Sequence, residues 1–296
     1  MSPHDGVLGP VLEELAQAGL DPEAVLAAID AALDEDLPGG AVDVTSVATI
    51  PADATGAGVF AAREPGIVAG LGIASLVFLR VSPEVVVDAR RPDGSRVAAG
   101  DVVMRVAGPT RALLTAERTA LNFASHLSGV ATATDSWVAA LAGTRARVLD
   151  TRKTLPRWRA LQKYAVRCGG GVNHRFSLSD MAMVKDNHVV AAGGVVPAYQ
   201  AVRAAYPGLA VEVEVTDLDQ LRELLAVGCE RILLDNMDAA TMAEAVRLTA
   251  GRASLEASGG LTLERAREVA ETGVDFISVG ALTHSVKVFD LGLDLQ

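Results

Sequence analysis

Short apolar segments alternate with amphipathic segments through the second half of the chain, from about Val148 onward. The apolar segments are typical of buried strands, and those between them of helices with one apolar face. Such alternation predicts a parallel sheet whose strands are joined by crossover helices. The expected strands are Arg147–Asp150, Met181–Lys185, Val211–Val215, Arg231–Asp235, Ser254–Ser258 and Asp275–Gly280. The expected helices are Trp158–Arg167, Val195–Ala205, Leu218–Ala226, Ala239–Thr249 and Leu263–Glu271.

Two arrangements of these segments are possible, a (β/α) barrel and a doubly wound open sheet. Most of the expected strands end in a polar residue, and in a barrel the carboxyl ends of the strands share one mouth, where such folds carry out their chemistry. We therefore favour the barrel. Its mouth is expected to carry Asp150, Lys185, Glu214, Asp235 and Ser258.

The first half of the chain is less regular. Helices are expected at Leu8–Ala18, Asp21–Asp34 and Thr110–Leu127, and short strands at Val85–Asp88, Arg96–Val97 and Val102–Val106. This mixture predicts an α+β domain over residues 1–129, followed by the barrel domain over residues 130–296. About the last 10 residues are a segment that can pack back on the first domain.

Composition excludes several classes of protein. The 296 residues are 50% hydrophobic, and a net charge of −11 argues against nucleic acid and anionic membranes as partners. The longest apolar stretch, Gly66–Leu79, is shorter than the ~20 residues that span a bilayer. Met1–Gly6 shows no secretion signal, and the two cysteines have no paired spacing. We therefore expect a cytoplasmic protein.

Positive charge is concentrated in residues 145–175, which carry a net charge of +8 against −19 for the rest of the chain. Arg152 and Lys153 directly follow an expected strand. Arginine binds carboxylate or phosphate with two parallel hydrogen bonds, and lysine is a mobile point charge, so the pair indicates a polyanionic ligand. A solvated helix face is the favoured interpretation for the other basic residues nearby. These are Arg157, Arg159, Lys163 and Arg167.

Three glycines, Gly169–Gly171, precede Asn173, His174 and Arg175. Glycine lets the backbone approach a ligand closely, although a glycine run alone also fits a flexible turn. His174 taken alone is better explained as a core histidine. The glycines followed at once by Asn-His-Arg favour a ligand-binding segment.

Lys185 ends an expected strand and has two chemical uses, as a Schiff-base nucleophile or as a cation for an anionic substrate. The alternative is a structural salt bridge with Glu214. We expect Glu214 and Asp235 to face each other across the mouth. There they can hold Mg²⁺ indirectly, accept hydrogen bonds from sugar hydroxyls or stabilise a cation. Glu212 shares the strand face of Glu214 but lies lower in the barrel.

Two turns of small residues follow the last two expected strands, Ser258-Gly259-Gly260 and Val279-Gly280-Ala281. Loops at this place in a barrel frequently bind phosphate through backbone N–H groups. Gly70–Ser75 imitates a dinucleotide-binding fingerprint but lacks its third glycine, so we discard it.

Several long motifs resemble the quinolinate phosphoribosyltransferase family, the decarboxylating nicotinate-nucleotide pyrophosphorylases. They extend from Glu117–Asn122 to Ser278–Ser285 and cover nearly the whole chain. The others are Thr151–Thr154, Lys163–Arg175, Lys185–His188, Glu212–Val215, Leu234–Asn236 and Glu256–Gly260. One difference is Pro156-Arg157, where the family usually has Pro-Gly, which adds charge and removes flexibility beside the site.

The resemblance implies an N-terminal α/β sandwich, an incomplete α/β barrel, and a homodimer with shared active sites, a higher oligomer being left open. It implies a pentosyltransferase of de novo NAD biosynthesis. Quinolinate and phosphoribosyl pyrophosphate would give nicotinate mononucleotide, pyrophosphate and CO₂. Mg²⁺ would arrive with phosphoribosyl pyrophosphate near Glu214 and Asp235, with no direct protein ligand. No organic cofactor is expected, because the cationic ring nitrogen stabilises the carbanion left by decarboxylation.

The resemblance also assigns roles to residues. The quinolinate carboxylates would meet Arg152, His174, Arg175 and Lys185, with Arg118 arriving from the partner subunit. Lys153 would serve the pyrophosphate, Glu214 and Asp235 the ribose and metal, and the two late turns the 5′-phosphate. Thr151 joins the substrate-binding set, and the catalytic set is Lys153, Lys185, Glu214 and Asp235.

Two other functions stay open at this point. The first is a Schiff-base aldolase that uses Lys185, which borohydride trapping with a carbonyl substrate would reveal. The second is a non-catalytic relative, such as the homologue associated with molybdenum uptake. The presence of every cationic ligand position argues against the second.

Overall fold

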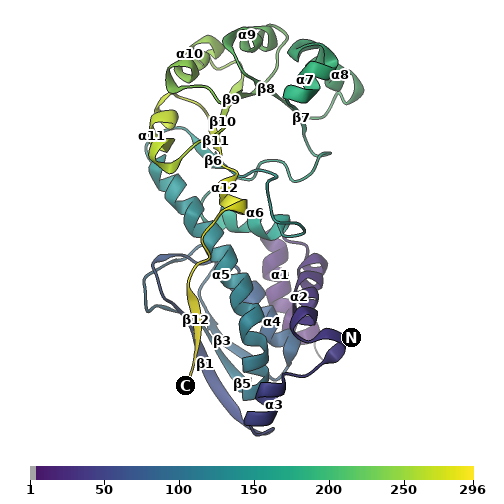
Figure 1. The fold of residues 1–296 in the computed structure, drawn as a ribbon, viewed down its shortest axis with the longest axis vertical. Coiled ribbons are helices and arrows are strands. Elements are labelled where there is room, and N and C mark those ends of the chain that lie inside the picture. The colour runs from purple at the N-terminus through teal and green to yellow at the C-terminus, as the bar shows by residue number, and fades with distance from the viewer. Residues whose placement is uncertain (1–4) are drawn as a thin grey trace. The chain divides into compact units, whose positions relative to one another are not determined.

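The computed structural model describes residues 5–296 (Figure 1). These fall into two compact units, the first of residues 5–133, 160–170 and 286–296, and the second of residues 134–159 and 171–285. The expected division at 129/130 gives residues 160–170 to the barrel domain instead. Residues 1–4, part of the segment searched for a secretion signal, lie outside the described residues. No helix in the described part has the length and apolar composition needed to cross a membrane.

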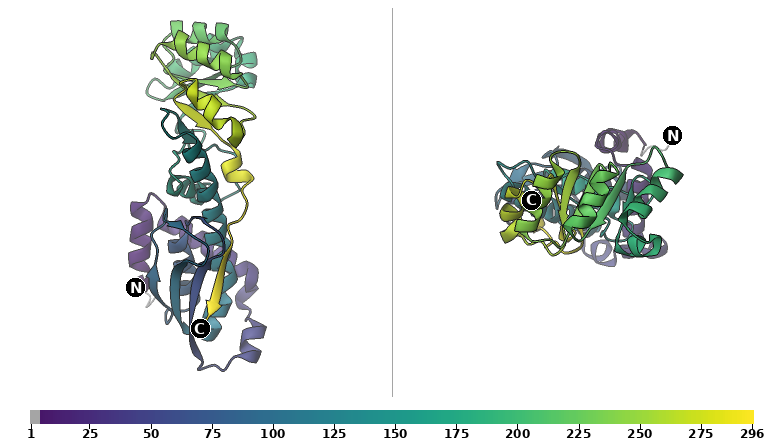
Figure 2. Two further views of the ribbon diagram at one scale, coloured as in Figure 1. Left: turned by 90° about the vertical axis from the view of Figure 1, so that its left-hand side faces the viewer. Right: turned by 90° about the horizontal axis from the view of Figure 1, so that it is seen from above.

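The first unit contains a four-stranded antiparallel sheet in the order β12-β1-β5-β3. Its strands are β1 (Thr55–Ala62), β3 (Val86–Arg90), β5 (Val102–Pro109) and β12 (Leu291–Leu295). A separate pair is formed by β2 (Gly66–Ile67) and β4 (Arg96–Val97). The end of the chain thus forms an edge strand, with Leu291 paired to Ala62 and Leu295 to Gly58, as the yellow strand in Figure 2 shows.

Helices complete the first unit. They are α1 (Asp5–Gln17), α2 (Pro22–Asp36), the 3₁₀ turn η1 (Pro38–Gly40), α3 (Val44–Thr49), α4 (Leu71–Val81) and most of α6 (Arg159–Cys168), and α5 (Thr110–Ala140) begins in this unit. The discarded nucleotide fingerprint is the start of α4, which is buried from Leu71 to Leu79. Asp93 accepts the N–H groups of Gly70 and Leu71 and the hydroxyl of Tyr164, and burial raises the pKa of this carboxyl. This part of the sequence is therefore structural.

The second unit is a curved parallel sheet in the order β6-β11-β10-β9-β8-β7. Its strands are β6 (Arg147–Leu149), β7 (Ala182–Val184), β8 (Val211–Val215), β9 (Arg231–Asp235), β10 (Ser254–Ser258) and β11 (Phe276–Ser278). Its helices are α7 (Asp186–Ala192), α8 (Val195–Ala205), α9 (Leu218–Ala226), α10 (Ala239–Thr249), α11 (Leu263–Glu271) and α12 (Ala281–His284). In the described chain β6 and β7 each pair with one strand of this sheet, so the barrel is incomplete, and the expected fold class is confirmed.

Apolar periodicity explains this architecture. Val213, Leu234 and Ala257 are fully buried on the central strands, and α8 to α11 cover the outer side of the sheet (Figure 1). The expected bounds of β8, β9, β10 and of these four helices agree with the structure residue for residue. Because all six strands run in one direction, their carboxyl ends meet at one edge.

Candidate active site

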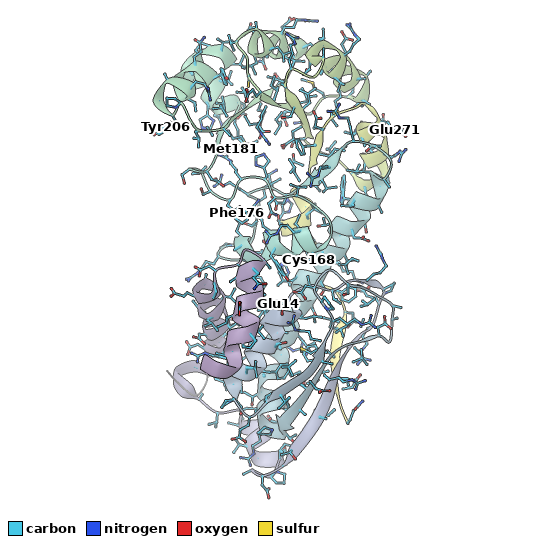
Figure 3. All side chains as sticks on the ribbon, turned by 180° about the vertical axis from the view of Figure 1, so that it is seen from behind. Glu14, Cys168, Phe176, Met181, Tyr206 and Glu271 are labelled. Carbon is cyan, nitrogen blue, oxygen red and sulfur yellow. The ribbon has the colours of Figure 1, made fainter. Side chains whose placement is uncertain are left out.

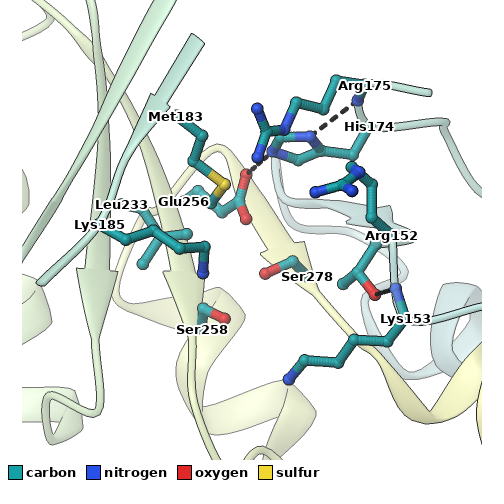
Figure 4. Close-up of a pocket in the computed structure, with 11 residues that line it drawn as sticks. Arg152, Lys153, His174, Arg175, Met183, Lys185, Leu233, Glu256, Ser258 and Ser278 are labelled. Atoms are coloured by element: carbon teal, nitrogen blue, oxygen red, sulfur yellow. Dashed lines mark hydrogen bonds and ion pairs between the residues drawn. The ribbon is translucent and has the colours of Figure 1, made fainter. Parts of the chain in front are cut away.

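A cavity of about 250 Å³ lies within the second unit, where the carboxyl halves of the strands and the following loops converge. Four cationic residues line it, Arg152, Lys153, Arg175 and Lys185. The remaining lining residues are Thr151, His174, Met183, Leu233, Glu256, Ser258 and Ser278. Figure 4 shows the Lys185 side chain on one side of the cavity and those of Arg152 and Lys153 on the other. Such a ring of cations favours a ligand with several negative charges.

The loop after β6 holds two of these cations in a tight turn. The Lys153 N–H donates to Thr151 Oγ1 at 3.0 Å, and the Thr154 N–H donates to the Arg152 carbonyl at 3.0 Å. Thr283, which is fully buried on α12, donates its hydroxyl to the Lys153 carbonyl at 2.6 Å. The Nε of Arg152 is buried and has no hydrogen-bond partner in the described chain. A buried donor without an acceptor is costly, so Arg152 is suited to an anion that enters the cavity.

His174 lies at the buried end of the cavity with both ring nitrogens in contact with protein atoms. Its Nε2 is 2.8 Å from Glu212 Oε2 and 3.3 Å from Glu256 Oε2. Its Nδ1 accepts the N–H of Arg175 at 2.8 Å. The resemblance gives His174 a contact with a substrate carboxylate, but this geometry supports a role in holding Arg175 and the strand carboxylates in place.

The protonation of this buried cluster follows from its contacts. Burial opposes a charge on His174, but hydrogen bonds to Glu212 and Glu256 raise the pKa of the imidazole to about 9. The backbone N–H aimed at Nδ1 acts in the opposite direction, because a proton on Nδ1 would break that bond. In the neutral ring, this contact therefore places the proton on Nε2, which faces Glu212. Burial and the neighbouring charge of Glu212 raise the pKa of Glu256.

Lys185 forms an ion pair with Glu214, with Nζ 3.3 Å from Oε2. The Lys185 side chain is 48% exposed, whereas a Schiff-base lysine is activated by desolvation or by another cation. The pairing with a carboxylate therefore favours the role of a cation that meets an anionic substrate.

Two expectations about acidic residues are wrong. Glu214 and Asp235 do not face each other across the mouth, because β8 and β9 are neighbours in the sheet and Glu214 is in register with Leu233. Asp150 does not point into the mouth, because it is fully buried and accepts hydrogen bonds from the Asn173 side chain and the His174 N–H. The Asp150 carboxylate therefore holds the loop backbone at His174 in place.

The interpretation of the basic residues near α6 as a solvated face is also wrong for two of them. Lys163 is fully buried, and Arg159 donates hydrogen bonds to Thr154 and to the carbonyl of Phe176. Arg157 is exposed, and it adopts a left-handed backbone with φ of 64°. That conformation is strained for a residue other than glycine, at the position where the sequence departs from the usual Pro-Gly.

The two turns expected to bind phosphate differ in what they offer. Ser258 lines the cavity, and Gly259 and Gly260 follow it with φ of 95° and 58°. The N–H of Val279 already donates to the Leu149 carbonyl at 2.9 Å, so it is not available to a phosphate. Gly280 and Ala281 begin α12, and Gly280 lies beside the Lys153 side chain.

Gly259 allows a direct test of this turn. A methyl group at Gly259 would lie 2.9 Å from the Asn236 nitrogen, and alanine is strained at this φ. We expect Gly259→Ala to lower the free energy of unfolding by about 2 kcal/mol or more, measured by urea denaturation. The matched control is Gly208→Ala, because nothing lies within 4 Å of that position and its φ is not positive. Equal effects of the two substitutions would contradict this account.

Sequence reasoning missed several residues of the cavity. Met183, Leu233, Glu256 and Ser278 line it, although none was a candidate. Strand periodicity could have found two of them, because Met183 shares a strand face with Lys185, and Glu256 with Ser258. Arg118, the candidate from the first half, lies exposed on α5 in the first unit.

The fold and the site together define an α/β-barrel protein with a cation-lined cavity among its strand ends. Comparison with known proteins gives the family. Residues 43–128 match the description "Quinolinate phosphoribosyl transferase, N-terminal domain" and residues 130–294 match the C-terminal domain of the same family. The chain belongs to the quinolinate phosphoribosyl transferase family.

Individual relatives agree with this. The chain is 52% identical over 272 residues to a nicotinate-nucleotide pyrophosphorylase [carboxylating] of Mycobacterium leprae, which covers 89% of this chain and 94% of that protein. It is 43% identical over 289 residues to a chloroplastic protein of that name from Arabidopsis thaliana, covering 91% and 82%. A solved nicotinate-nucleotide pyrophosphorylase from Francisella tularensis superposes with a TM-score of 0.90 at 37% identity, covering 94% and 98%.

Proposed function

We propose that this protein is a quinolinate phosphoribosyltransferase. It joins quinolinate to phosphoribosyl pyrophosphate and releases nicotinate mononucleotide, pyrophosphate and CO₂, a reaction of de novo NAD biosynthesis. The observation that supports this most strongly is the set of four cations around one cavity, with an unpartnered buried donor on Arg152. The names of the relatives describe the same reaction. The experiment that tests the proposal measures release of pyrophosphate and CO₂ that depends on quinolinate.

The residues in and beside the cavity have different roles in this reaction. Arg152, Arg175 and Lys185 bind the two quinolinate carboxylates, and Lys153 binds the pyrophosphate of the second substrate. The leaving pyrophosphate gains negative charge as the ribose C1 bond breaks, so a cation there stabilises the transition state. Carboxylates near the ribose stabilise the oxocarbenium-like carbon in the same step. We assign this role to Glu214 and Asp235, which do not line the cavity: Glu214 pairs with the lining residue Lys185, and Asp235 ends β9.

Decarboxylation follows from the product of that transfer. Once the ring nitrogen carries the ribose it is a cation, and the bond from C2 to its carboxylate breaks with the electron pair left on C2. The adjacent positive nitrogen stabilises this pair, C2 then takes a proton, and CO₂ leaves. The chemistry needs no organic cofactor in this account.

Mg²⁺ fits the donor set of the site. Glu214 and Asp235 are hard oxygen donors at the ends of neighbouring strands, and Mg²⁺ is usually held by one or two carboxylates together with substrate phosphates. The ion would come with phosphoribosyl pyrophosphate and supply charge neutralisation to the leaving group. In the described chain the grouped acidic and histidine ligands are His174, Glu212 and Glu256. His174 Nε2 is already hydrogen-bonded to Glu212 and lies 3.3 Å from Glu256 Oε2. We therefore assign the metal to the Glu214 and Asp235 side.

We further propose that the protein is cytoplasmic and works as a homodimer in which Arg118 completes the active site of the partner subunit. The exposure of Arg118 on α5 supports this. A two-fold dimer would exchange two such arginines reciprocally.

Mixing two inactive variants tests the shared site. We expect Arg118→Ala and Lys185→Ala dimers each to be nearly inactive, because every active site lacks one cation. After subunit exchange, half of the dimers are mixed, and each mixed dimer has one intact site and one site with both defects. Activity should therefore recover to roughly a quarter of wild type. If exchange is confirmed by mass spectrometry and no activity returns, Arg118 serves its own subunit or none.

A further inference from the structure

Two separate loops of the second unit carry three of the four cations of the cavity. The loop after β6 carries Arg152 and Lys153, and the segment that leads toward β7 carries His174 and Arg175. Phe176 and Met181, both labelled in Figure 3, mark the two ends of the remainder of that segment. Strands fix neither loop along its length, so the distance from Arg152 and Lys153 to Arg175 depends on contacts between the loops.

Asp150 joins the two loops where they leave the sheet. It directly follows β6, and its carboxylate accepts the Asn173 side-chain amide at 2.6 Å and the His174 N–H at 2.8 Å. This contact fixes the two loops on the side of the cations that is next to the sheet. The residues that follow Lys153 and Arg175 must be held by other contacts.

Arg159 joins the loops on the other side of the cations. Its Nε donates to Thr154 Oγ1 at 3.1 Å, and its Nη1 donates to the Phe176 carbonyl at 2.8 Å. Thr154 directly follows Lys153, and Phe176 directly follows Arg175. One planar guanidinium thus contacts the residue after Lys153 and the residue after Arg175, and its rigid fork sets the direction of both bonds.

The acceptor on the second loop is itself held in place. The N–H groups of Phe176 and Ser177 donate to the Asp180 carboxylate at 2.7 and 2.9 Å, and these bonds lower the pKa of Asp180 to about 2. Arg175 donates through Nη1 to the Met181 carbonyl at 2.9 Å. The segment is therefore a closed turn, and Arg159 connects this turn to the first loop.

We propose that Arg159 is a positioning residue that sets the spacing between Arg152 and Lys153 on one loop and Arg175 on the other. Preorganised charges bind a ligand more tightly because less freedom is lost on binding. The ligands named here are those of the proposed function, on which this inference rests. Arg159 aligns the site for the dicarboxylate with the site for pyrophosphate, and it touches neither substrate.

Steady-state kinetics give the first test. We expect Arg159→Ala to raise the KM for quinolinate and that for phosphoribosyl pyrophosphate by about tenfold each, because Arg152 and Lys153 lose their fixed spacing from Arg175. Guanidinium chloride at millimolar concentration should restore part of the loss, because the free ion can occupy the bridging position. Arg159→Lys should restore less than guanidinium does, because an ammonium lacks the planar fork. The control is Arg265→Ala, an exposed arginine of α11 that pairs with Glu268 on the same helix.

Thr154→Val separates the bridge from a general loss of structure. Valine keeps the size of threonine and removes the acceptor of Arg159 Nε. We expect this substitution to reproduce part of the loss in the wild-type background and to add little in the Arg159→Ala background, as a double-mutant cycle requires for two residues in contact. Additive effects would contradict the bridge.

Hydrogen exchange measures the bridge without any turnover. In Arg159→Ala, amides of residues 151–158 and of residues 174–180 should both exchange faster, and guanidinium should slow both again. Faster exchange in only one segment, or an unchanged pattern, would overturn the proposal. If wild-type protein fails to turn over quinolinate, the proposed function is wrong, while the exchange result still decides whether Arg159 bridges the loops.

Discussion

Replacing Arg175 with alanine is expected to weaken quinolinate binding by about a hundredfold or more, while leaving the affinity for phosphoribosyl pyrophosphate within a few-fold of wild type. Burial lowers the pKa of Arg175, and the nearby charge of Arg152 lowers it further. A dianion bound between the two guanidinium groups reduces the electrostatic repulsion between them. Loss of one partner from a desolvated charge pair costs about 3–5 kcal/mol, which corresponds to that factor or more.

Lys153→Ala is the complementary variant. Lys153 lies in the loop held by Thr283, beside the Gly280 turn. We expect it to lose affinity for phosphoribosyl pyrophosphate and to keep its affinity for quinolinate. Calorimetric titration of each variant with each substrate separately measures both effects. If both variants lost affinity for the same substrate alone, the division of the cavity into two anion sites would be wrong.

Much of the barrel could be predicted from the sequence because its periodicity is regular. The segments Val211–Val215, Arg231–Asp235 and Ser254–Ser258 are short apolar runs between amphipathic helices, and the structure has strands with these bounds. Each crossover packs against the strands next to it, so local pattern and tertiary structure agree.

The first unit was harder to predict for physical reasons. The strand β1 is rich in alanine and glycine. The strand β12 pairs with it from the far end of the chain, and no local sequence pattern predicts this contact. Helix α4 is apolar on all sides, because it is buried, and so shows no helical period. Helix α5 extends to Ala140 through serine, glycine and threonine, which have low helix propensity and suggested an end at Leu127.

The candidate site, too, could be predicted only in part from the sequence. Lys185 directly follows β7, and Arg152 and Lys153 lie in the loop just after β6, so their place at the mouth follows from the fold. The burial of Asp150 and the bridge made by Arg159 could not be predicted, because both depend on how two loops meet. A charged residue near a site looks the same in the sequence whether it binds substrate or orders the residues that do.

We expect the rate of product formation from nicotinate to be close to zero. Nicotinate lacks the carboxylate at C2, so one of the cations around the cavity would stay desolvated and unpaired. An unpaired polar partner in a site built for it lowers the specificity constant by about 10⁴-fold. Nicotinate also has no carboxyl group at the carbon from which CO₂ is lost.

The most direct measurement compares the two acids at equal concentration with phosphoribosyl pyrophosphate and Mg²⁺. Pyrophosphate release and CO₂ release are followed in the same samples. Our account predicts that quinolinate gives the two products in equal amounts and that nicotinate gives neither at a comparable rate. Comparable pyrophosphate release from nicotinate, or pyrophosphate from quinolinate without CO₂, would contradict the assignment of this cavity as a decarboxylating phosphoribosyltransferase site.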